Sequence, residues 1–197
     1  MDLSVYHALN DFAYEHAFVG DLAKFFAQYA VFVLVAAVAL IWLTGPDRAG
    51  RAERHVTFAA GIATILALLI VQMINHLYYR TRPFVHHAHH LLIAHGKDAS
   101  FPSDHTSGAF AIAFTFMLFG RRALGLTALT VGILIAAARV MVGVHYPTDV
   151  LGGMVVGAIA ALIVWIAPVR ELLCKVSDRL SDYLPWRAEQ AEGWGER

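Results

Sequence analysis

Five long apolar runs, separated by short charged segments, constrain this chain more than any other feature. They cover Phe25–Leu43, Val56–Leu77, Phe101–Phe119, Ala123–Val144 and Val150–Val169. Each run is close to the ~20 residues that cross ~30 Å of hydrocarbon. Only 15% of the residues are charged, against about 25% in a typical soluble domain. Since buried helices of a soluble protein rarely supply five such runs, the pattern predicts an all-α, polytopic transmembrane bundle of five or six helices.

The two ends of the chain are predicted to lie outside the membrane core. Residues 1–23 carry several carboxylates and no basic n-region, which argues against a span and an ordinary signal peptide. One helical face of this segment is apolar and suggests an interfacial helix, with a frayed terminus as the alternative; it comprises Val5, Leu9, Phe12 and Ala13. We expect a single domain over residues 1–197, with an interfacial segment (1–23), a transmembrane core (24–169) and a cytoplasmic tail (170–197), disordered beyond Pro185.

Basic residues in alternate loops predict the orientation of the bundle. They are Arg48, Arg51 and Arg54 in the first loop, Arg121 and Arg122 in the third, and Arg170 and Lys175 in the tail. These loops are expected to be cytoplasmic. The N-terminal segment, the loop from Tyr78 to Ser100 and the turn near His145 would then face outside. The formal net charge of zero gives no indication of a nucleic-acid partner, and Cys174, the sole cysteine, excludes an intrachain disulfide.

Arg139 lies deep in an apolar run, where a charged side chain suggests function. The alternative is an arginine that snorkels to the headgroups. His145 and Asp149 follow closely, and a carboxylate four residues from a histidine can hold one ring nitrogen and leave the other free to attack. The alternative there is a helix-capping Asp149 beside an interfacial His145. Pro147 suits the first turn of the next helix.

Two further short polar segments border the apolar runs, at Ser103–His105 and at Arg82. These segments and the set Arg139, His145 and Asp149 are called the polar islands below. Ser103 is a natural N-cap residue, and a helix N-terminus offers N–H groups to an anion, to which His105 could add a proton donor. A plain capped helix start would explain Ser103 and Asp104 but not His105. Arg82, before Pro83, offers a guanidinium fork for phosphate oxygens, or else it is a snorkelling residue at a helix end.

Together these islands resemble the type 2 phosphatidic acid phosphatase family, within the acid-phosphatase and vanadium-haloperoxidase superfamily. The family motifs are Lys-x6-Arg-Pro, Pro-Ser-Gly-His and Ser-Arg-x5-His-x3-Asp. The corresponding residues here are Asn75-x6-Arg82-Pro83, Pro102-Ser103-Asp104-His105 and Ala138-Arg139-x5-His145-x3-Asp149. Order and internal spacing match throughout, over roughly residues 56–167.

The resemblance implies a role for each matching residue. His145 would be the nucleophile that forms a phosphohistidine, and Asp149 would orient and polarise it. His105 would be the general acid for the leaving group and then the base for water. Arg82, Ser103 and Arg139 would bind the phosphate oxygens. The family requires no metal or other cofactor.

Three positions depart from the family motifs. Asn75 replaces the lysine; it is expected on the same helical face as Arg82, two turns away, and Arg80 is a candidate to supply the missing charge. Ala138 replaces the motif serine. Asp104 replaces the glycine and is expected to hold Arg82 or Arg80. Asp104 and Asn75 are kept in the predicted phosphate-binding set, with Asn75 as a weak member.

The Pro-Ser-Asp-His form, the small size and the N-terminal segment are similar to the bacitracin-resistance type of bacterial undecaprenyl-diphosphatase. This resemblance implies an enzyme of the bacterial plasma (inner) membrane whose outward-facing site removes phosphate from undecaprenyl diphosphate. A phosphatidylglycerophosphate or phosphatidate phosphatase is the alternative. The expected partner is a lipid phosphate in the membrane, and the oligomeric state is left open.

Histidines crowd the loop after Arg82, at His86, His87, His89, His90 and His95. Zinc or copper could bind such a cluster, but no acidic or cysteine ligand joins it in the sequence. We therefore expect a loop over the catalytic mouth that touches headgroups and whose charge near pH 6 tunes activity. A transporter is a less favoured reading of the whole chain, since the polar residues cluster at one interface. An inactive scaffold is disfavoured because the catalytic residues are all present.

Overall fold

The computed structural model describes residues 2–44, 50–87 and 89–183, and every regular element in these ranges is a helix. The helices are α1 (Asp2–Glu15), α2 (Ala17–Gln28), α3 (Ala30–Thr44), α4 (Gly50–Leu77), α5 (Pro83–His86), α6 (Asp104–Leu118), α7 (Arg122–Met141), α8 (Pro147–Trp165) and α9 (Ala167–Ser181). The predicted all-α fold is confirmed. The disorder predicted beyond Pro185 and the cytoplasmic position of Arg48 concern residues outside these ranges.

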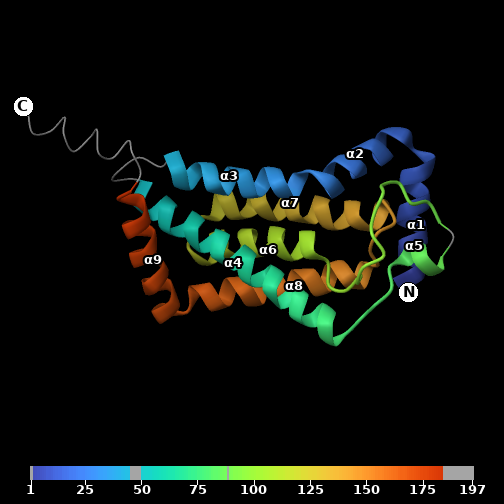
Figure 1. Cartoon of the computed structure of the whole chain (residues 1–197). Coiled ribbons are helices and arrows are strands. Elements are labelled where there is room, and N and C mark those ends of the chain that lie inside the picture. The colour runs from blue at the N-terminus through green and yellow to red at the C-terminus, as the bar shows by residue number, and fades with distance from the viewer. Residues whose placement is uncertain (1, 45–49, 88, 184–197) are drawn as a thin grey trace, which may run out of the picture.

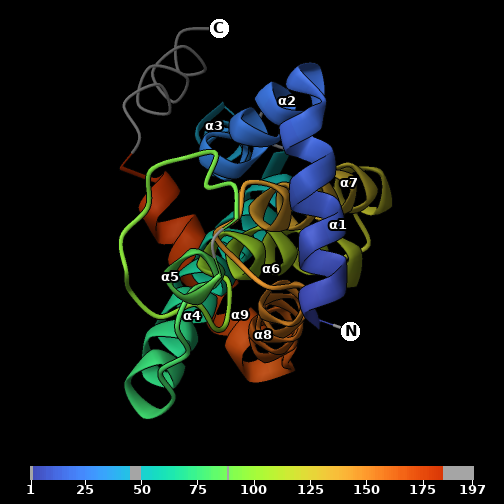
Figure 2. The same ribbon diagram turned by 90° about the vertical axis from the view of Figure 1, so that its right-hand side faces the viewer.

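Helix α6 forms the centre of the bundle, and α4, α7 and α8 pack around it (Figure 2). Small residues let α8 approach α6 closely. A Cβ on Gly157 would lie 2.7 Å from the backbone nitrogen of Ala111, so a larger residue there would push the two helices apart. Gly153 precedes it by one turn, which gives the small-xxx-small spacing common where membrane helices touch.

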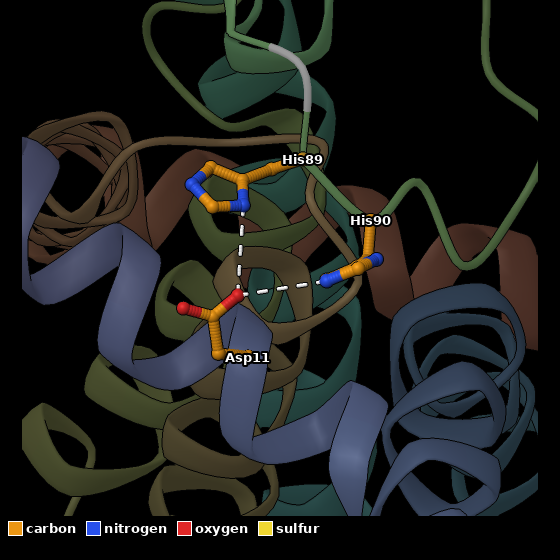
Figure 3. A group of neighbouring side chains, drawn as sticks. All are labelled: Asp11, His89 and His90. Atoms are coloured by element: carbon orange, nitrogen blue, oxygen red, sulfur yellow. Dashed lines mark ion pairs between the residues drawn. The ribbon is translucent and has the colours of Figure 1, made fainter.

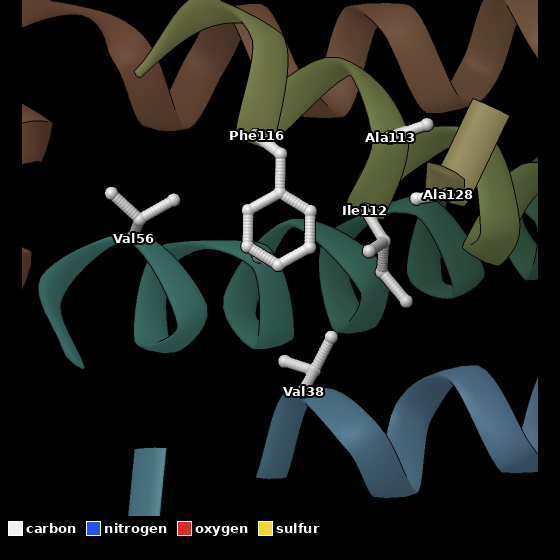
Figure 4. Packing of buried hydrophobic residues seen from close by; sticks show 7 residues of the cluster. Val38, Val56, Ile112, Ala113, Phe116 and Ala128 are labelled. Atoms are coloured by element: carbon white, nitrogen blue, oxygen red, sulfur yellow. The ribbon is translucent and has the colours of Figure 1, made fainter. Parts of the chain in front are cut away.

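The apolar core of the bundle joins α3, α4, α6 and α7. One cluster, shown in Figure 4, consists of Val38, Val56, Ala60, Ile112, Ala113, Phe116 and Ala128. Large apolar side chains also cover the outside of the bundle; examples are Phe32, Ile65, Leu69, Leu126 and Val155, all more than half exposed. A soluble monomer rarely exposes so much contiguous apolar surface, and a lipid environment accounts for it.

Among the described residues, three helices are long and apolar enough to cross a membrane, namely Arg51–Leu77, Arg122–Met141 and Pro147–Trp165. The pair α2 and α3, bent by 46°, makes a fourth if it counts as one span. The remaining expected span, Phe101–Phe119, is the 15-residue α6, about 22 Å long. It is shorter than the ~30 Å hydrocarbon layer but is enclosed by the other helices.

The predicted span ends shift by a few residues where the backbone turns. Helix α7 ends at Met141 rather than Val144, because Gly143 adopts a left-handed conformation with φ +88°. The fifth span ends at Trp165 rather than Val169, and Pro168 starts the first turn of α9. These turns end the spans before the apolar sequence does.

Residues 2–15 form an ordered helix across one end of the bundle (Figure 1). The alternative of a frayed terminus is therefore wrong. The face that packs on the bundle carries Tyr6, Asn10 and Ala13, while Val5 and Phe12 of the predicted apolar face are exposed. Helix α9 crosses the opposite end, where α4 and α7 begin (Figure 1).

Candidate active site

The polar islands of the sequence meet at the end of the bundle that α1 and α5 cover (Figure 1). The N-terminus of α6, the C-terminus of α7 and the N-terminus of α8 all point to this end. The loop between α5 and α6 closes over it. Five of the predicted residues are at least 97% buried there: Arg82, Ser103, Arg139, His145 and Asp149.

His145 occupies the turn between α7 and α8 and is 1% exposed. Its Nε2 lies 3.1 Å from Arg82 Nη1 and 3.1 Å from Arg139 Nη2. Because a guanidinium only donates hydrogen bonds, Nε2 must accept and carries no proton. The ring proton then resides on Nδ1, which faces Asp149 Oδ2 at 3.5 Å. The free nitrogen needed for attack therefore points at the two arginines.

Asp149 lies in the first turn of α8 and is fully buried. Its Oδ2 accepts hydrogen bonds from Ser100 Oγ at 2.5 Å and from the backbone N–H of Tyr146 at 2.8 Å. Its Oδ1 accepts one from Arg80 Nη1 at 2.7 Å. Asp149 thus caps the helix, as the alternative interpretation expected, and also faces the ring of His145, which is buried.

The two arginines are held from several sides. Arg82 donates from Nε to Asp98 Oδ1 at 2.8 Å and from Nη1 to the carbonyl of Val144 at 3.0 Å. Arg139 donates from Nη1 to the carbonyl of Ala27 at 3.2 Å. At 3% and 2% exposed, neither side chain extends to the surface, so the snorkelling alternative is wrong for both.

The start of α6 brings Ser103, Asp104 and His105 to the site. Ser103 is the N-cap residue, but its Oγ accepts from Thr106 Oγ1 at 3.1 Å instead of capping the backbone. Asp104 Oδ1 contacts His105 Nδ1 at 2.9 Å and lies 4.0 Å from Arg139 Nη2. The expectation that Asp104 holds Arg82 or Arg80 is therefore wrong. A chain of contacts runs from His105 through Asp104 and Arg139 to His145.

Asn75 and Ala138 lie apart from this network of hydrogen bonds. Helix α4 ends at Leu77, so Asn75 and Arg82 do not share a helical face as expected. Asn75 Oδ1 is buried and has no hydrogen-bond partner among the described residues. Ala138 is 2% exposed and packs in an apolar cluster with Ala27 and Val142. A methyl group therefore fills the place of the family serine.

Several residues of the site were not selected from the sequence. The loop before α6 contributes His95, whose Nε2 lies 3.1 Å from Arg139 Nη2, together with Asp98 and Ser100. Helix α1 contributes Asp2, whose Oδ2 accepts from Arg80 Nη2 at 2.7 Å. Loop residues have no periodicity, so only their proximity in the fold identifies them. The position of His95 agrees with a loop over the mouth of the site.

Burial and charge alter the protonation of the groups in this end of the bundle. Burial, together with the positive charges of Arg139 and Arg82, lowers the pKa of His145 to about 4, although Asp149 opposes the shift. Burial and Arg82 also lower the pKa of His95. Burial raises the pKa of Asp98, but the hydrogen bond and the positive charge of Arg82, together with a backbone hydrogen bond and His95, leave that pKa below its ordinary value. His145 and His95 are thus neutral at pH 7.

This arrangement can receive a phosphoryl group. Two buried guanidinium groups flank an unprotonated imidazole nitrogen and can bind the oxygens of a tetrahedral anion. Preorganised cations of this kind stabilise the charge that develops in phosphoryl transfer. A second histidine, His105, stands on the same chain of contacts and is 18% exposed in its side chain, so it can reach a bound molecule.

Comparisons with known proteins agree with this geometry. Residues 56–172 match the model of the PAP2 superfamily. The chain is 37% identical over 163 residues to undecaprenyl-diphosphatase BcrC of Bacillus subtilis, which covers 83% of this chain and 82% of that protein. It is 30% identical over 199 residues to the putative undecaprenyl-diphosphatase YbjG of Escherichia coli, which covers 98% and 96% of the two chains.

The fold is also found among solved structures. The crystal structure of LpxE from Aquifex aeolicus superimposes with a TM-score of 0.61 at 22% sequence identity, and covers 82% of this chain and 93% of that one. The region that matches the family model contains all the site residues described above except those of α1 and α2. This chain therefore belongs to the PAP2 superfamily, the phosphatase family that its three motifs resemble, and is a multi-pass membrane phosphatase.

Proposed function

We propose that this enzyme is an undecaprenyl-diphosphatase, which removes the terminal phosphate of undecaprenyl diphosphate through a phosphohistidine at His145. The curated relatives BcrC and YbjG, at 37% and 30% identity, carry the name undecaprenyl-diphosphatase. The observation that carries the mechanism is the position of His145 Nε2, 3.1 Å from a guanidinium nitrogen of each of Arg82 and Arg139.

In the first step, His145 Nε2 attacks the terminal phosphorus and the bond to the bridging oxygen breaks. His105 gives a proton to that oxygen, which leaves with the lipid monophosphate. Asp149 stabilises the positive charge that the ring of His145 acquires. In the second step, His105 takes a proton from water, which attacks the phosphohistidine and releases phosphate.

The phosphate oxygens are bound by Arg82, Arg139 and the N-terminus of α6 at Ser103. Arg139 Nε is buried and without a hydrogen-bond partner among the described residues, so this donor is available to a phosphoryl oxygen. Arg80 does not replace the missing family lysine as a phosphate ligand, because its guanidinium is engaged by Asp149 and Asp2. Asn75 contributes little in this scheme.

A groove beside His105 supports a lipid substrate. An apolar hollow of about 460 Å³ lies between α3, α4 and α6, with Asp104 and His105 at one end. A second hollow of about 370 Å³ shares Val35 and Ile65 with the first and continues to Trp42. A prenyl chain in this groove would keep its apolar surface out of water and bring its diphosphate to His105.

The active site is proposed to face the outside of the bacterial plasma membrane. Arg51 and Arg121 lie at the ends of α4 and α7 opposite the site, and an excess of basic residues favours the cytoplasmic side. In this orientation α1 is part of an interfacial segment (residues 1–23), residues 24–169 form the core, and the tail from residue 170 is cytoplasmic. The whole chain is one domain.

The test is phosphate release by the purified protein from undecaprenyl diphosphate and from phosphatidylglycerophosphate, measured side by side with a chelator present. We expect faster turnover of the prenyl diphosphate, and loss of both activities in His145→Ala. Preference for the glycerophospholipid would keep the mechanism and reject the substrate. Activity that survives in His145→Ala would reject the mechanism.

A further inference from the structure

A second polar cluster joins helix α1 to the loop over the site. Asp11 Oδ1 lies 3.5 Å from His89 Nδ1 and 3.7 Å from His90 Nε2. Figure 3 shows both imidazole rings turned toward this one carboxylate oxygen. The ligand atoms of all three residues lie within 4.8 Å of one another. The expectation that no acidic ligand joins the loop histidines is therefore wrong, because the fold brings Asp11 to them.

The distances in this cluster suit a shared metal ion better than hydrogen bonds. An N–H···O hydrogen bond measures about 2.7–3.2 Å, so 3.5 Å and 3.7 Å are too long. Two ligands on a tetrahedral zinc ion, with bonds of about 2.0–2.2 Å, stand about 3.4 Å apart. The two carboxylate–imidazole spacings exceed this by only a few tenths of an ångström, which small side-chain rotations would remove.

The backbone at this cluster is already fixed. Asn10, the neighbour of Asp11, is fully buried. Its Nδ2 donates to the carbonyls of His90 and Met141, both at 2.8 Å, and its Oδ1 accepts the N–H of His90 at 3.1 Å. The loop is thereby held against α1 beside Asp11, so binding an ion would require little further ordering of the chain.

The two imidazole rings are also held in place from α1. The ring of Tyr14 stacks on His90 at 3.5 Å with an angle of 2°, and the ring of His7 lies 3.7 Å from that of His89. Positions 7, 11 and 14 follow one face of the helix. His7 Nδ1 is buried without a hydrogen-bond partner in the described structure. Side-chain exposures of 25% to 43% for the three ligand residues leave an entry path.

We propose that Asp11, His89 and His90 form a zinc site that clamps the loop to α1. Two imidazoles and a carboxylate suit zinc, whereas magnesium and calcium prefer oxygen ligands alone. The clamped loop continues to His95 and Asp98, which contact Arg139 and Arg82 at the active site. The ion takes no part in phosphoryl transfer; it holds the loop that covers the site, and the proposal stands independently of which lipid the enzyme hydrolyses.

The test uses the full-length protein in detergent, without a histidine tag, stripped with a chelator and then freed of it. Zinc binding is measured by competition with a chromophoric chelator for the wild type and for Asp11→Asn, His89→Gln and His90→Gln. His86→Gln, which changes an exposed histidine of α5, is the matched control. We expect one zinc ion per chain in the wild type and in His86→Gln, and loss of this binding in the other three variants.

Amide hydrogen exchange of residues 89–100 provides a second readout. Zinc should slow exchange there in the wild type and in His86→Gln but not in His89→Gln. Equal helix content and thermal stability of the zinc-free proteins exclude misfolding as the cause. The proposal is overturned if the wild type binds no zinc, if His89→Gln and Asp11→Asn bind it as the wild type does, or if bound zinc leaves loop exchange unchanged.

Discussion

Replacing Asp104 by alanine distinguishes a residue that positions His105 from one that binds phosphate. Asp104 Oδ1 lies 2.9 Å from His105 Nδ1 and 4.0 Å from Arg139 Nη2. A hydrogen bond involving a charged group contributes about 1.5–3 kcal/mol. Because the carboxylate is 44% exposed, solvent screening favours the lower value. At about 1.4 kcal/mol per factor of ten, Asp104→Ala should lower kcat about tenfold and leave KM nearly unchanged.

Steady-state phosphate release from undecaprenyl diphosphate measures this effect. Asp104→Asn keeps an acceptor oxygen for His105 Nδ1, so its kcat should fall by only about threefold. In His105→Ala, the additional change Asp104→Ala should have no further effect, because the ring it positions is gone. A raised KM with unchanged kcat in Asp104→Ala would refute the reasoning and return Asp104 to the phosphate-binding set.

The remaining predictions concern His145, Arg82 and Gly143. His145→Ala should lower turnover by more than about 10⁴-fold, and rapid acid-free quenching of the wild type with labelled substrate should trap a phosphohistidine that the variant lacks. Because the pKa of His145 is lowered to about 4, Nε2 stays unprotonated well below pH 6.5; the acid limb of kcat/KM should therefore fall near pH 4, and a fall centred at 6.5 would contradict the burial argument. Arg82→Lys should lower kcat by about 10²–10³-fold, since one oxyanion donor is lost. Gly143→Ala should destabilise the fold by about 1–3 kcal/mol, because its Cβ would lie 2.7 Å from the His90 carbonyl. The control Gly120→Ala also changes a glycine with positive φ, but one with open space around it. In thermal unfolding, its melting temperature should fall less than that of Gly143→Ala.

Much of the fold follows from local sequence. Runs of about 20 apolar residues must form helices in lipid, because the backbone finds no other hydrogen-bond partners there. The predicted helix starts at Ser103 and Pro147 are confirmed. Pro147 acts within its own helical turn, whereas Ser103 occupies the N-cap position without a side-chain cap hydrogen bond. The early end of α7 depends on the left-handed turn at Gly143, where a Cβ would meet atoms of α1 and of the loop.

The sequence predicts His145, Asp149, Arg82 and Arg139 as site residues, and the fold places the other three around His145. Arg139, His145 and Asp149 lie close together in the chain, and a charged side chain such as Arg139 in an apolar run is easily recognised. Asp104 was selected for the wrong contacts. Its partner is the adjacent His105. Whether the Asp104 carboxylate contacts this neighbour or a distant arginine depends on the direction of its side chain, and the spacing of residues in the sequence does not give that direction.

The supports of the site were decided only by the tertiary structure. Ser100 and Arg80 bind Asp149, and Asp98 binds Arg82. Asp11 approaches His89 and His90, which lie 78 and 79 positions later in the sequence. These contacts join loops and α1 to the helices, and neither helical periodicity nor a short motif encodes them. Periodicity and motif spacing report interactions within one helix or turn, whereas these partners meet only after the bundle has packed and brought distant segments to the same end.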